Sequence, residues 1–342
     1  MSLLLFLIIG FFFLMWCSSK LHFPWGKQLV VLFLIIIMGL RYNVGRDYPA
    51  YELIYDEPYS YAAMGIEPIW KWINSLLHFI GFQSRGFFFL TSSIIAIGYC
   101  RGIKKLSNHF YLSALLFILC GFYYESANMV RQYVAMALLF CGFLDFVNKK
   151  YWKYILWIIV AAMFHFSVFV VIPIIFLTHY RYSFWLLLSA LLVSFFYGDM
   201  LLNILISTIM PSLQDIGSYQ YDIDDFDAGI GSGTLKIFYN IIALFVLFLY
   251  LKYGKNISSF FCILMNMVLI GVIIYNVCYL FMPARRLYLY FFSYIIILFP
   301  YCLHWLKRES QFIAFGTICV FFLIFLLKSY WGIPYDFDFS FF

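Results

Sequence analysis

The chain consists of a series of long apolar stretches that are separated by short groups of charged residues. A helix that spans a membrane needs about 20 mostly apolar residues, and most of these stretches approach that length. Charged residues make up only 11% of the 342 residues, whereas a soluble domain has about 25%. A soluble surface needs more polar cover than this. The sequence therefore predicts an all-α, polytopic membrane protein.

The lengths of the stretches predict about 12 transmembrane helices. No segment between them is long enough to form a soluble domain, so we expect residues 1–342 to be a single integral membrane domain. A shorter amphipathic stretch, Glu67–Ile80, is predicted to re-enter the membrane or to lie at its surface as an interfacial helix. The predicted spans are residues 2–17, 28–40, 85–102, 109–124, 128–147, 150–165, 166–180, 183–199, 235–252, 257–281, 286–305 and 311–328.

The positions of Lys and Arg predict the orientation, because cytoplasmic loops are enriched in them. With both termini outside, most Lys and Arg residues lie inside, and all acidic residues except Asp145 and Glu309 lie outside. A full span at Glu67–Ile80 would move the basic cluster 101–105 outside, which favours the re-entrant or interfacial alternative.

The longest polar segment, residues 200–234, is predicted to be an external acidic loop. It ends in a glycine-rich run, Gly229–Gly233, which favours flexibility. Loops of this kind often close over binding sites, so we interpret this one as a lid. Its acidic residues are Asp215, Asp222, Asp224, Asp225 and Asp227.

Three arginine clusters lie on the predicted outer face, where the positive-inside tendency does not place them. They are Arg41–Tyr48, Asn128–Gln132 and the pair Arg285–Arg286. An ionised side chain at membrane depth costs about 2.5–3.5 kcal/mol, so these arginines need anionic partners. The internal candidates are Asp47, Glu67 and Glu125.

An external partner is the alternative, and phosphate fits because the planar guanidinium forms two parallel charge-assisted hydrogen bonds with it. The competing interpretation is that these arginines only anchor helices at lipid headgroups. We favour anchoring for Arg85 and Lys328 and a phosphate site for Arg41, Arg46 and Arg131.

His165 lies between two short apolar stretches, 150–165 and 166–180. The loop charges are consistent only if these form a hairpin, which places His165 at its outer tip. A lone histidine on an apolar helix is commonly a buried structural residue, and this alternative stays open. Because imidazole changes its charge near neutral pH, the other alternative is a catalytic or phosphate-binding histidine.

Several kinds of chemistry have no signal in this sequence. The chain has no G-x-S-x-G, H-E-x-x-H or phosphate-binding G-x-x-x-x-G-K-[ST] motif. Its eight cysteines all lie in or beside apolar runs, where they are typical of buried apolar packing. We therefore expect no metal, no cofactor, no nucleotide donor and no nucleic-acid partner.

Six short motifs resemble, in order and spacing, the EpsG family of exopolysaccharide and O-antigen polymerases, which are Wzy-like proteins. The resemblance covers residues 41–335, and one departure from the family pattern is Arg46, which adds a cation between Gly45 and Asp47. The motifs are Arg41-x-x-x-Gly45-x-Asp47-Tyr48-x-x-Tyr51, Glu67-Pro68, Asn128-x-x-Arg131-Gln132-x-x-Ala135, Ala161-x-x-Phe164-His165-x-Ser167, Arg286-x-x-x-Tyr290-Phe291 and Pro334-Tyr335.

The resemblance implies a GT-C-like glycosyltransferase in the bacterial inner membrane that acts on its periplasmic face. It implies lipid-linked donor and acceptor, with undecaprenyl pyrophosphate as the leaving group, and a flippase and a chain-length regulator as further partners. The predicted catalytic residues are His165 and Arg131. The predicted pyrophosphate-binding residues are Arg41, Arg46, Arg285 and Arg286, and the predicted substrate-binding or orienting residues are Asp47, Tyr48, Glu67, Asn128, Gln132 and Tyr290.

Three alternative functions remain open at the level of sequence. An O-antigen ligase uses the same donor but usually has a longer outer loop. A flippase or other transporter needs charged residues through the whole bilayer, whereas here the middle of each span is apolar. A membrane acyltransferase can also use a histidine within the membrane.

Overall fold

The computed structural model describes residues 3–20, 25–58, 65–213, 233–254, 257–305, 308–330 and 336–337. Within these ranges the chain is helical apart from loops and one short antiparallel pairing, in which Arg41–Tyr42 (β1) lies beside Asp336–Phe337 (β2). Helices are expected because lipid offers no water to hydrogen-bond the backbone of an apolar segment. The all-α prediction is confirmed.

The chain forms two compact units, which we call unit 1 (Met1–Phe169 and Phe299–Phe342) and unit 2 (Val170–Leu298). The short helix η2 (Phe166–Val170) and the helix α16 (Ile295–Cys302) cross the boundaries between them. Nothing in the sequence predicted these boundaries, and the prediction of a single domain remains a prediction.

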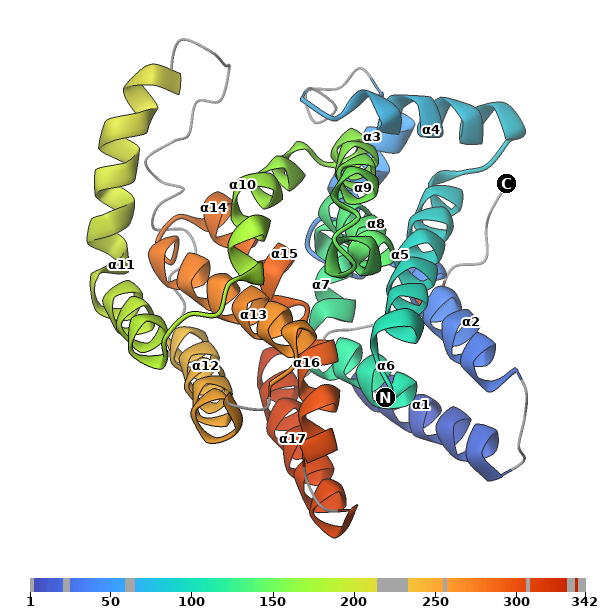
Figure 1. Cartoon of the computed structure of the whole chain (residues 1–342). Coiled ribbons are helices and arrows are strands. Elements are labelled where there is room, and N and C mark those ends of the chain that lie inside the picture. The colour runs from blue at the N-terminus through green and yellow to red at the C-terminus, as the bar shows by residue number, and fades with distance from the viewer. Residues whose placement is uncertain are drawn as a thin grey trace. The chain divides into compact units, whose positions relative to one another are not determined.

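Unit 1 is built on α5 and α8, which pack side by side, with α9 against α8 and α2 against α5. Small residues allow this close approach, since a Cβ at Gly98 of α5 would lie only 2.8 Å from the Cβ of Ala137 of α8. The short helix α3 and the helix α4 lie at one end of this group (Figure 1). The helices of unit 1 are α1 (Leu3–Lys20), α2 (Gly26–Gly39), α3 (Tyr48–Asp56), α4 (Pro68–Ile80), α5 (Ser84–Leu106), α6 (Phe110–Leu119), α7 (Phe122–Asn128), α8 (Val130–Val147), α9 (Tyr151–Phe164), η7 (Leu303–Trp305) and α17 (Arg308–Tyr330).

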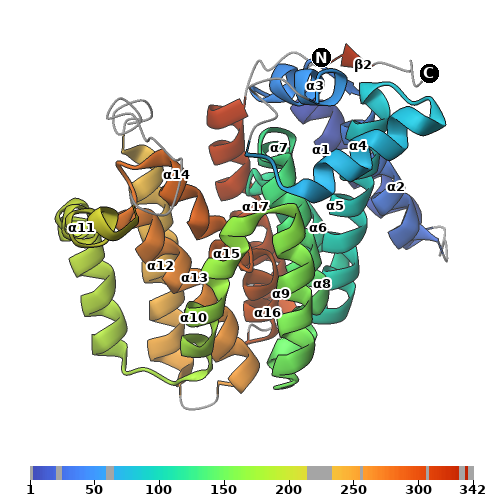
Figure 2. The same cartoon turned by 90° about the horizontal axis from the view of Figure 1, so that it is seen from above.

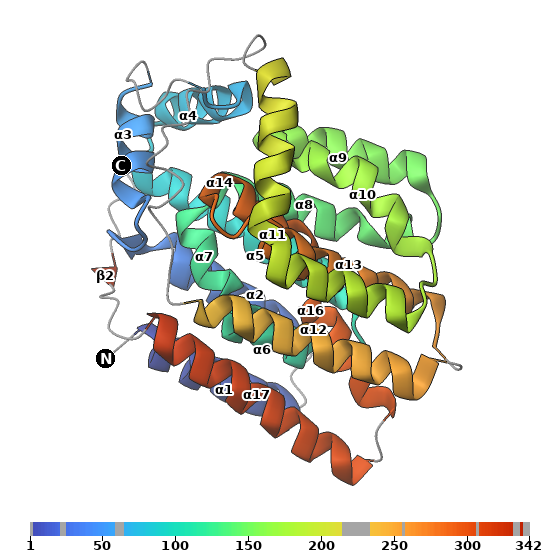
Figure 3. The same ribbon diagram turned by 90° about the vertical axis from the view of Figure 1, so that its left-hand side faces the viewer.

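Unit 2 is built around α13, which contacts η3, α11, α12, η6 and α15. Figure 3 shows α11, α12 and α13 lying side by side. Gly198 permits the tight contact of α11 with α13, because its Cβ would meet the carbonyl oxygen of Asn276 at 2.4 Å. The helices of unit 2 are α10 (Val171–Ile175), η3 (Phe176–His179), α11 (Phe184–Leu213), α12 (Thr234–Tyr253), α13 (Ser259–Val277), α14 (Met282–Arg285), η6 (Arg286–Tyr288) and α15 (Leu289–Phe292).

Side-chain amides join three helices of unit 2 in the middle of an apolar environment. Asn240 of α12 and Asn276 of α13 donate to each other's side-chain oxygens, at 2.8 and 3.0 Å. Asn276 also donates to Ser194 of α11, at 3.0 Å. Interhelical hydrogen bonds of this kind hold membrane helices together where lipid removes the hydrophobic driving force.

Six helical segments of the described residues are long and apolar enough to cross a membrane. They are α5, α8, α11, α12, α13 and the continuous run Met282–Cys302, which contains α14 to α16. A seventh span is formed if the bent pair α6 and α7 counts as one. The other apolar helices are shorter. For example, α2 has 14 residues, which at a rise of about 1.5 Å per residue gives about 21 Å, less than the hydrocarbon core of about 30 Å. The chain is thus a membrane protein, and the count of about 12 spans remains a prediction.

The amphipathic helix predicted at Glu67–Ile80 is present as α4, which ends at Gly81 in the left-handed conformation. One face packs on the protein through Trp70, Asn74 and Leu77. The other face carries large apolar residues that are exposed, among them Trp72 and Phe79, as expected of a helix at a membrane surface. Figure 2 shows α4 beside α3 and the ends of α5 and α9.

The start of the predicted acidic loop at residue 200 is wrong, because α11 continues to Leu213. Gly198 and Asp199 do not stop the helix, since the apolar residues that follow them continue it. The remaining part of the predicted lid, residues 214–232, lies outside the described residues, as do Pro334 and Tyr335.

Candidate functional site

Glu67 is the centre of a polar cluster on the predicted outer side of unit 1. Its carboxylate is 4% exposed. One oxygen, Oε2, accepts a hydrogen bond from Nη1 of Arg131 at 2.6 Å. The other, Oε1, accepts from Nδ1 of His165 at 2.9 Å and from the backbone N–H of Phe166 at 3.4 Å. We call Glu67, Arg131 and His165 the triad.

Three helix ends position the triad. Glu67 immediately precedes Pro68, which begins α4, so its extended backbone brings the carboxylate to the end of this helix. Arg131 is the second residue of α8, and His165 follows the last residue of α9 with an extended backbone. Trp70 holds the ends together, because its indole N–H donates to the carbonyl of Phe164 at 2.9 Å.

The charges within the triad determine the form of His165. Burial raises the pKa of Glu67, but the His165 hydrogen bond and the Arg131 charge outweigh it and lower the pKa below its ordinary value. Glu67 is therefore ionised at neutral pH and can only accept hydrogen bonds. When His165 is neutral, its proton thus resides on Nδ1, and the lone pair of Nε2 is available.

Both side chains that donate to the Glu67 carboxylate remain accessible. The side chains of Arg131 and His165 are 28% and 25% exposed. Nε of Arg131 is itself buried and has no hydrogen-bond partner among the described residues. The triad therefore presents an imidazole and part of a guanidinium outward from a buried carboxylate.

Tyr51 of α3 is a fourth member of this neighbourhood. Its hydroxyl contacts Arg131 through a hydrogen bond. Burial raises the pKa of Tyr51 against the opposing Arg131 charge, so the phenol stays protonated at neutral pH. Tyr51 belongs to the sequence motif at 41–51, but sequence reasoning assigned it no role.

The predicted arginine cluster at 41–48 forms a tight turn beside α7. Arg41 is 1% exposed, and it donates to the backbone carbonyls of Met38 at 3.1 Å and Ala127 at 3.4 Å. Arg46 is exposed, and its backbone N–H donates to Oδ1 of Asn128 at 2.6 Å. Asn128 therefore orients the turn that carries Arg46. The guanidinium of Arg41, in contrast, is buried and bonded to backbone carbonyls.

A second charged cluster forms between α3 and α5. Nη1 of Arg85 donates to Oε1 of Glu52 at 2.8 Å and to the Tyr48 hydroxyl at 2.5 Å. Arg85 is 8% exposed, so its interpretation as a lipid anchor is wrong. Burial raises the pKa of Tyr48 to about 12, which keeps this predicted substrate-orienting residue a hydroxyl.

The other predicted site residues are divided between the two units. In unit 1, Asp47 precedes α3 and is partly exposed, and Gln132 is buried in α8. In unit 2, Arg285 donates to the carbonyl of Tyr279 at 2.9 Å, and Tyr290 is buried. Arg286 lies in η6 of the same unit.

A protein-family model, described as the EpsG family, matches residues 27–341. This range includes the whole triad. The chain belongs to the EpsG family. Membership in the EpsG family indicates a membrane protein of polysaccharide biosynthesis. No curated protein and no solved structure matches the chain.

Within the described residues, no three His, Cys, Asp or Glu side chains are grouped closely enough to hold a metal ion. At the triad, this EpsG-family protein offers one carboxylate, one imidazole and one guanidinium.

Proposed function

We propose that this protein polymerises lipid-linked oligosaccharide repeat units of an O-antigen, capsule or exopolysaccharide, as a Wzy-like enzyme. It transfers the growing glycan from undecaprenyl pyrophosphate to the non-reducing end of a new lipid-linked unit, on the periplasmic face of the inner membrane. The observation that carries the proposal is the triad, in which a buried carboxylate orients an accessible imidazole beside an arginine.

In the proposed reaction His165 is the general base. The hydroxyl oxygen of the acceptor sugar attacks the anomeric carbon of the donor, and its proton passes to Nε2 of His165. Glu67 is a positioning residue, because its hydrogen bond to Nδ1 holds the imidazole in the required tautomer and stabilises the imidazolium that forms. A positioned general base typically accelerates a reaction about 10²–10⁴-fold.

Arg131 acts on the leaving group in this proposal. As the bond between the anomeric carbon and the phosphate oxygen breaks, negative charge develops on the pyrophosphate. Preorganised cations at that position stabilise the transition state. Arg131 lies in the first turn of α8, whose N-terminal end adds positive potential.

Arg46, which is exposed in the same unit, is proposed as a further pyrophosphate contact. Arg41, also predicted as a pyrophosphate contact, is instead buried against the backbone carbonyls of Met38 and Ala127. Arg285 and Arg286 lie in unit 2 and stay predictions.

The test is complementation of a strain that lacks this gene, with polymer length read from a silver-stained gel. His165→Asn and Arg131→Lys should abolish the ladder of long chains and leave single repeat units attached to the lipid A-core. The matched controls His109→Asn and Arg101→Lys change exposed residues outside the site and should retain the ladder. A full ladder from normally expressed His165→Asn protein contradicts the assignment of the base.

The same gel separates the alternative functions. Loss of a ligase leaves the lipid A-core with no repeat unit at all, whereas loss of a polymerase leaves a single repeat unit on the lipid A-core. Loss of a flippase also removes all units, and the lipid-linked unit then accumulates on the cytoplasmic side. Either of these outcomes for the deletion strain would overturn the polymerase proposal.

A further inference from the structure

The helix α3 buries one face, and that face consists of three tyrosines. Tyr48, Tyr51 and Tyr55 are its buried residues, and their spacing of three and four residues places them on one side of the helix. Tyr48 stacks on Phe88 of α5, with the ring centroids 4.3 Å apart. Tyr51 stacks on Phe87 of the same helix, at 5.9 Å. Phenylalanine would fill the same space, so the hydroxyl groups need a reason of their own.

The hydroxyl groups of Tyr51 and Tyr55 bond to different parts of unit 1. Tyr55 donates to the backbone carbonyl of Phe82, in the turn before α5, at 2.6 Å. The phenol oxygen of Tyr51 is hydrogen-bonded to the guanidinium and to the backbone N–H of Arg131. Both of these groups can only donate, so the phenol oxygen accepts. Tyr51 thus connects α3 to the triad.

The backbone N–H of Arg131 explains why an oxygen from another helix is needed here. This N–H belongs to the first turn of α8, where such groups have no acceptor within their own helix. The residue before the helix, Met129, provides no side-chain cap. Tyr51 supplies an acceptor for the N–H and, with the same atom, for the guanidinium. The guanidinium is therefore held between two oxygens, the phenol of Tyr51 and the carboxylate of Glu67, which accepts from Nη1 at 2.6 Å.

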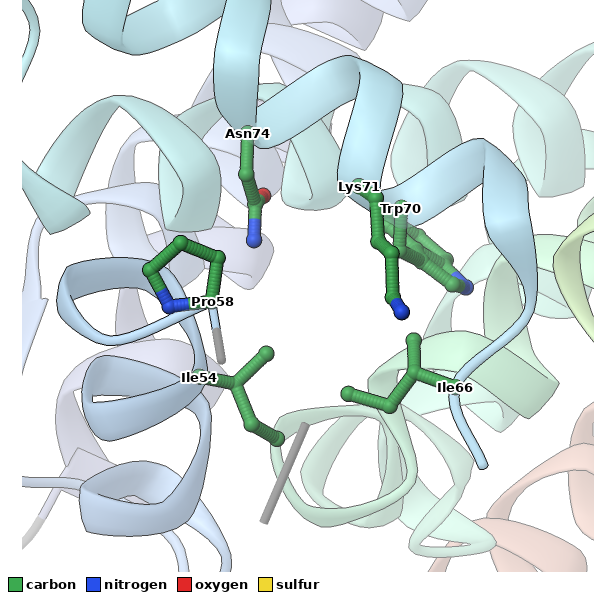
Figure 4. Close-up of a pocket in the computed structure, with 6 residues that line it drawn as sticks. All are labelled: Ile54, Pro58, Ile66, Trp70, Lys71 and Asn74. Atoms are coloured by element: carbon green, nitrogen blue, oxygen red, sulfur yellow. The ribbon is translucent and has the colours of Figure 1, made fainter. Parts of the chain in front are cut away.

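A polar contact with α5 fixes the position of α3. Nη1 of Arg85 donates to Oε1 of Glu52 at 2.8 Å. On the side of α4, by contrast, Ile54 of α3 faces Trp70 across a small gap with mainly apolar walls (Figure 4). The helix is therefore fixed mainly through its contacts with α5, and the buried face that packs there carries Tyr51.

We propose that Tyr51 is a positioning residue that keeps the guanidinium of Arg131 turned toward the pyrophosphate of the donor. Without the phenol oxygen, the Glu67 carboxylate attracts the guanidinium into a two-pronged ion pair, a geometry that arginine and carboxylate frequently adopt. That pairing turns N–H groups of Arg131 away from the leaving group. The inference rests on the proposed function for the identity of this ligand, whereas the orientation of Arg131 does not depend on it.

The first experiment measures initial rates of the purified, detergent-solubilised full-length protein with lipid-linked repeat units extracted from a strain that lacks the gene. Tyr51→Phe should lower kcat about tenfold, because Arg131 loses one of its two fixed contacts. KM should change little, since charge on the leaving group grows as the bond breaks.

Tyr55→Phe is the matched control. It removes an equally buried, hydrogen-bonded hydroxyl from the same face of α3 and should lower the melting temperature by a similar amount. Its kcat should equal that of the unaltered protein, because Tyr55 bonds to the turn at Phe82 and not to Arg131. A loss of kcat that is equal in the two variants would show that Tyr51 only stabilises the fold.

The second experiment reads the orientation of Arg131 without any reaction. In heteronuclear NMR spectra of protein with isotope-labelled arginine, the side-chain signal of Arg131 is the one that Arg131→Lys removes. This signal should shift in Tyr51→Phe, where the aromatic ring is retained and only the oxygen is lost, and should stay in place in Tyr55→Phe.

An unchanged Arg131 signal, or full kcat in folded Tyr51→Phe protein, would overturn the inference. The two proposals fail in different ways. Absence of turnover in the unaltered protein contradicts the proposed reaction, and the NMR signal still decides whether Tyr51 orients Arg131.

Discussion

At the scale of single residues, the lowered pKa of Glu67 makes a contribution to stability that depends on pH. Its pKa lies below the ordinary value of 4.5 in the folded protein. The stabilisation that its hydrogen bonds provide is therefore complete above pH 4.5 and is lost as the pH falls through the lowered folded value. Hydrogen bonds to charged groups contribute about 1.5–3 kcal/mol.

Glu67→Gln should consequently lower the melting temperature at pH 7, because it leaves the Arg131 charge without its carboxylate. The difference from the unaltered protein should shrink below pH 4.5, where Glu67 itself becomes protonated. The nine tryptophans allow unfolding to be followed by intrinsic fluorescence. The control Glu57→Gln removes an exposed carboxylate and should have little effect. A difference that stays constant down to pH 3 would contradict this assignment.

Gly45 supports the turn that presents Arg46. Its φ is +105°, and an added Cβ would lie 3.0 Å from Oδ1 of Asn128 and 3.1 Å from the carbonyl oxygen of Ala127. Gly45→Ala should therefore destabilise the protein by about 1–3 kcal/mol, measured as a lower melting temperature. Gly316→Ala in α17 is the control, since its Cβ meets no atom within 4 Å and alanine favours a helix. Equal melting temperatures for the two variants would show that the turn is not strained.

The pairing within the triad could be anticipated only in part. Sequence reasoning placed Arg131 and His165 on one side of the membrane and offered three acids as partners, Asp47, Glu67 and Glu125. Glu67 is 64 residues from Arg131 and 98 from His165, so tertiary packing decides the choice. For the same reason the sequence did not predict the ion pair of Arg85, because its partner Glu52 is brought to it by the packing of α3 on α5.

At the scale of elements, apolar length predicted most helix boundaries because charged residues follow many helices closely. The span predicted at 128–147 is α8, Val130–Val147, and that at 235–252 is α12, Thr234–Tyr253. The end of α11 could not be predicted in this way, because Asp199 is a single charge within a longer apolar run.

Hydrogen bonds among Asn240, Asn276 and Ser194 join the helices α12, α13 and α11 of unit 2. The apolar pattern of the sequence alone does not predict that these helices are neighbours. Asn276→Leu should lower the melting temperature, because Asn240 and Ser194 each lose a hydrogen bond in an apolar environment. The double variant Asn240→Leu with Asn276→Leu should be more stable than additivity predicts, by about 0.6–1.7 kcal/mol. Asn203→Leu, at an exposed position of α11, is the control and should be close to neutral. Strict additivity would show that the two amides do not interact.

At the scale of the whole molecule, α8 relates the candidate site to the orientation of the chain. It has 18 residues, so its length of about 27 Å is close to the hydrocarbon thickness of about 30 Å. Arg131 lies in its first turn, and the basic pair Lys149–Lys150 follows its last residue. The two ends of this helix should therefore lie on opposite sides of the membrane, with the lysines inside.

Reporter fusions test this orientation. Alkaline phosphatase, which is active only outside the cytoplasm, should be inactive when fused after Lys149 and active when fused after Gly81, in the turn between α4 and α5. Green fluorescent protein should show the opposite pattern. Phosphatase activity after Lys149 would place Arg131, and with it Glu67 and His165, on the cytoplasmic side. A donor that is presented in the periplasm would then be out of reach of the triad, because these three side chains are joined by direct hydrogen bonds and cannot face opposite sides of the membrane.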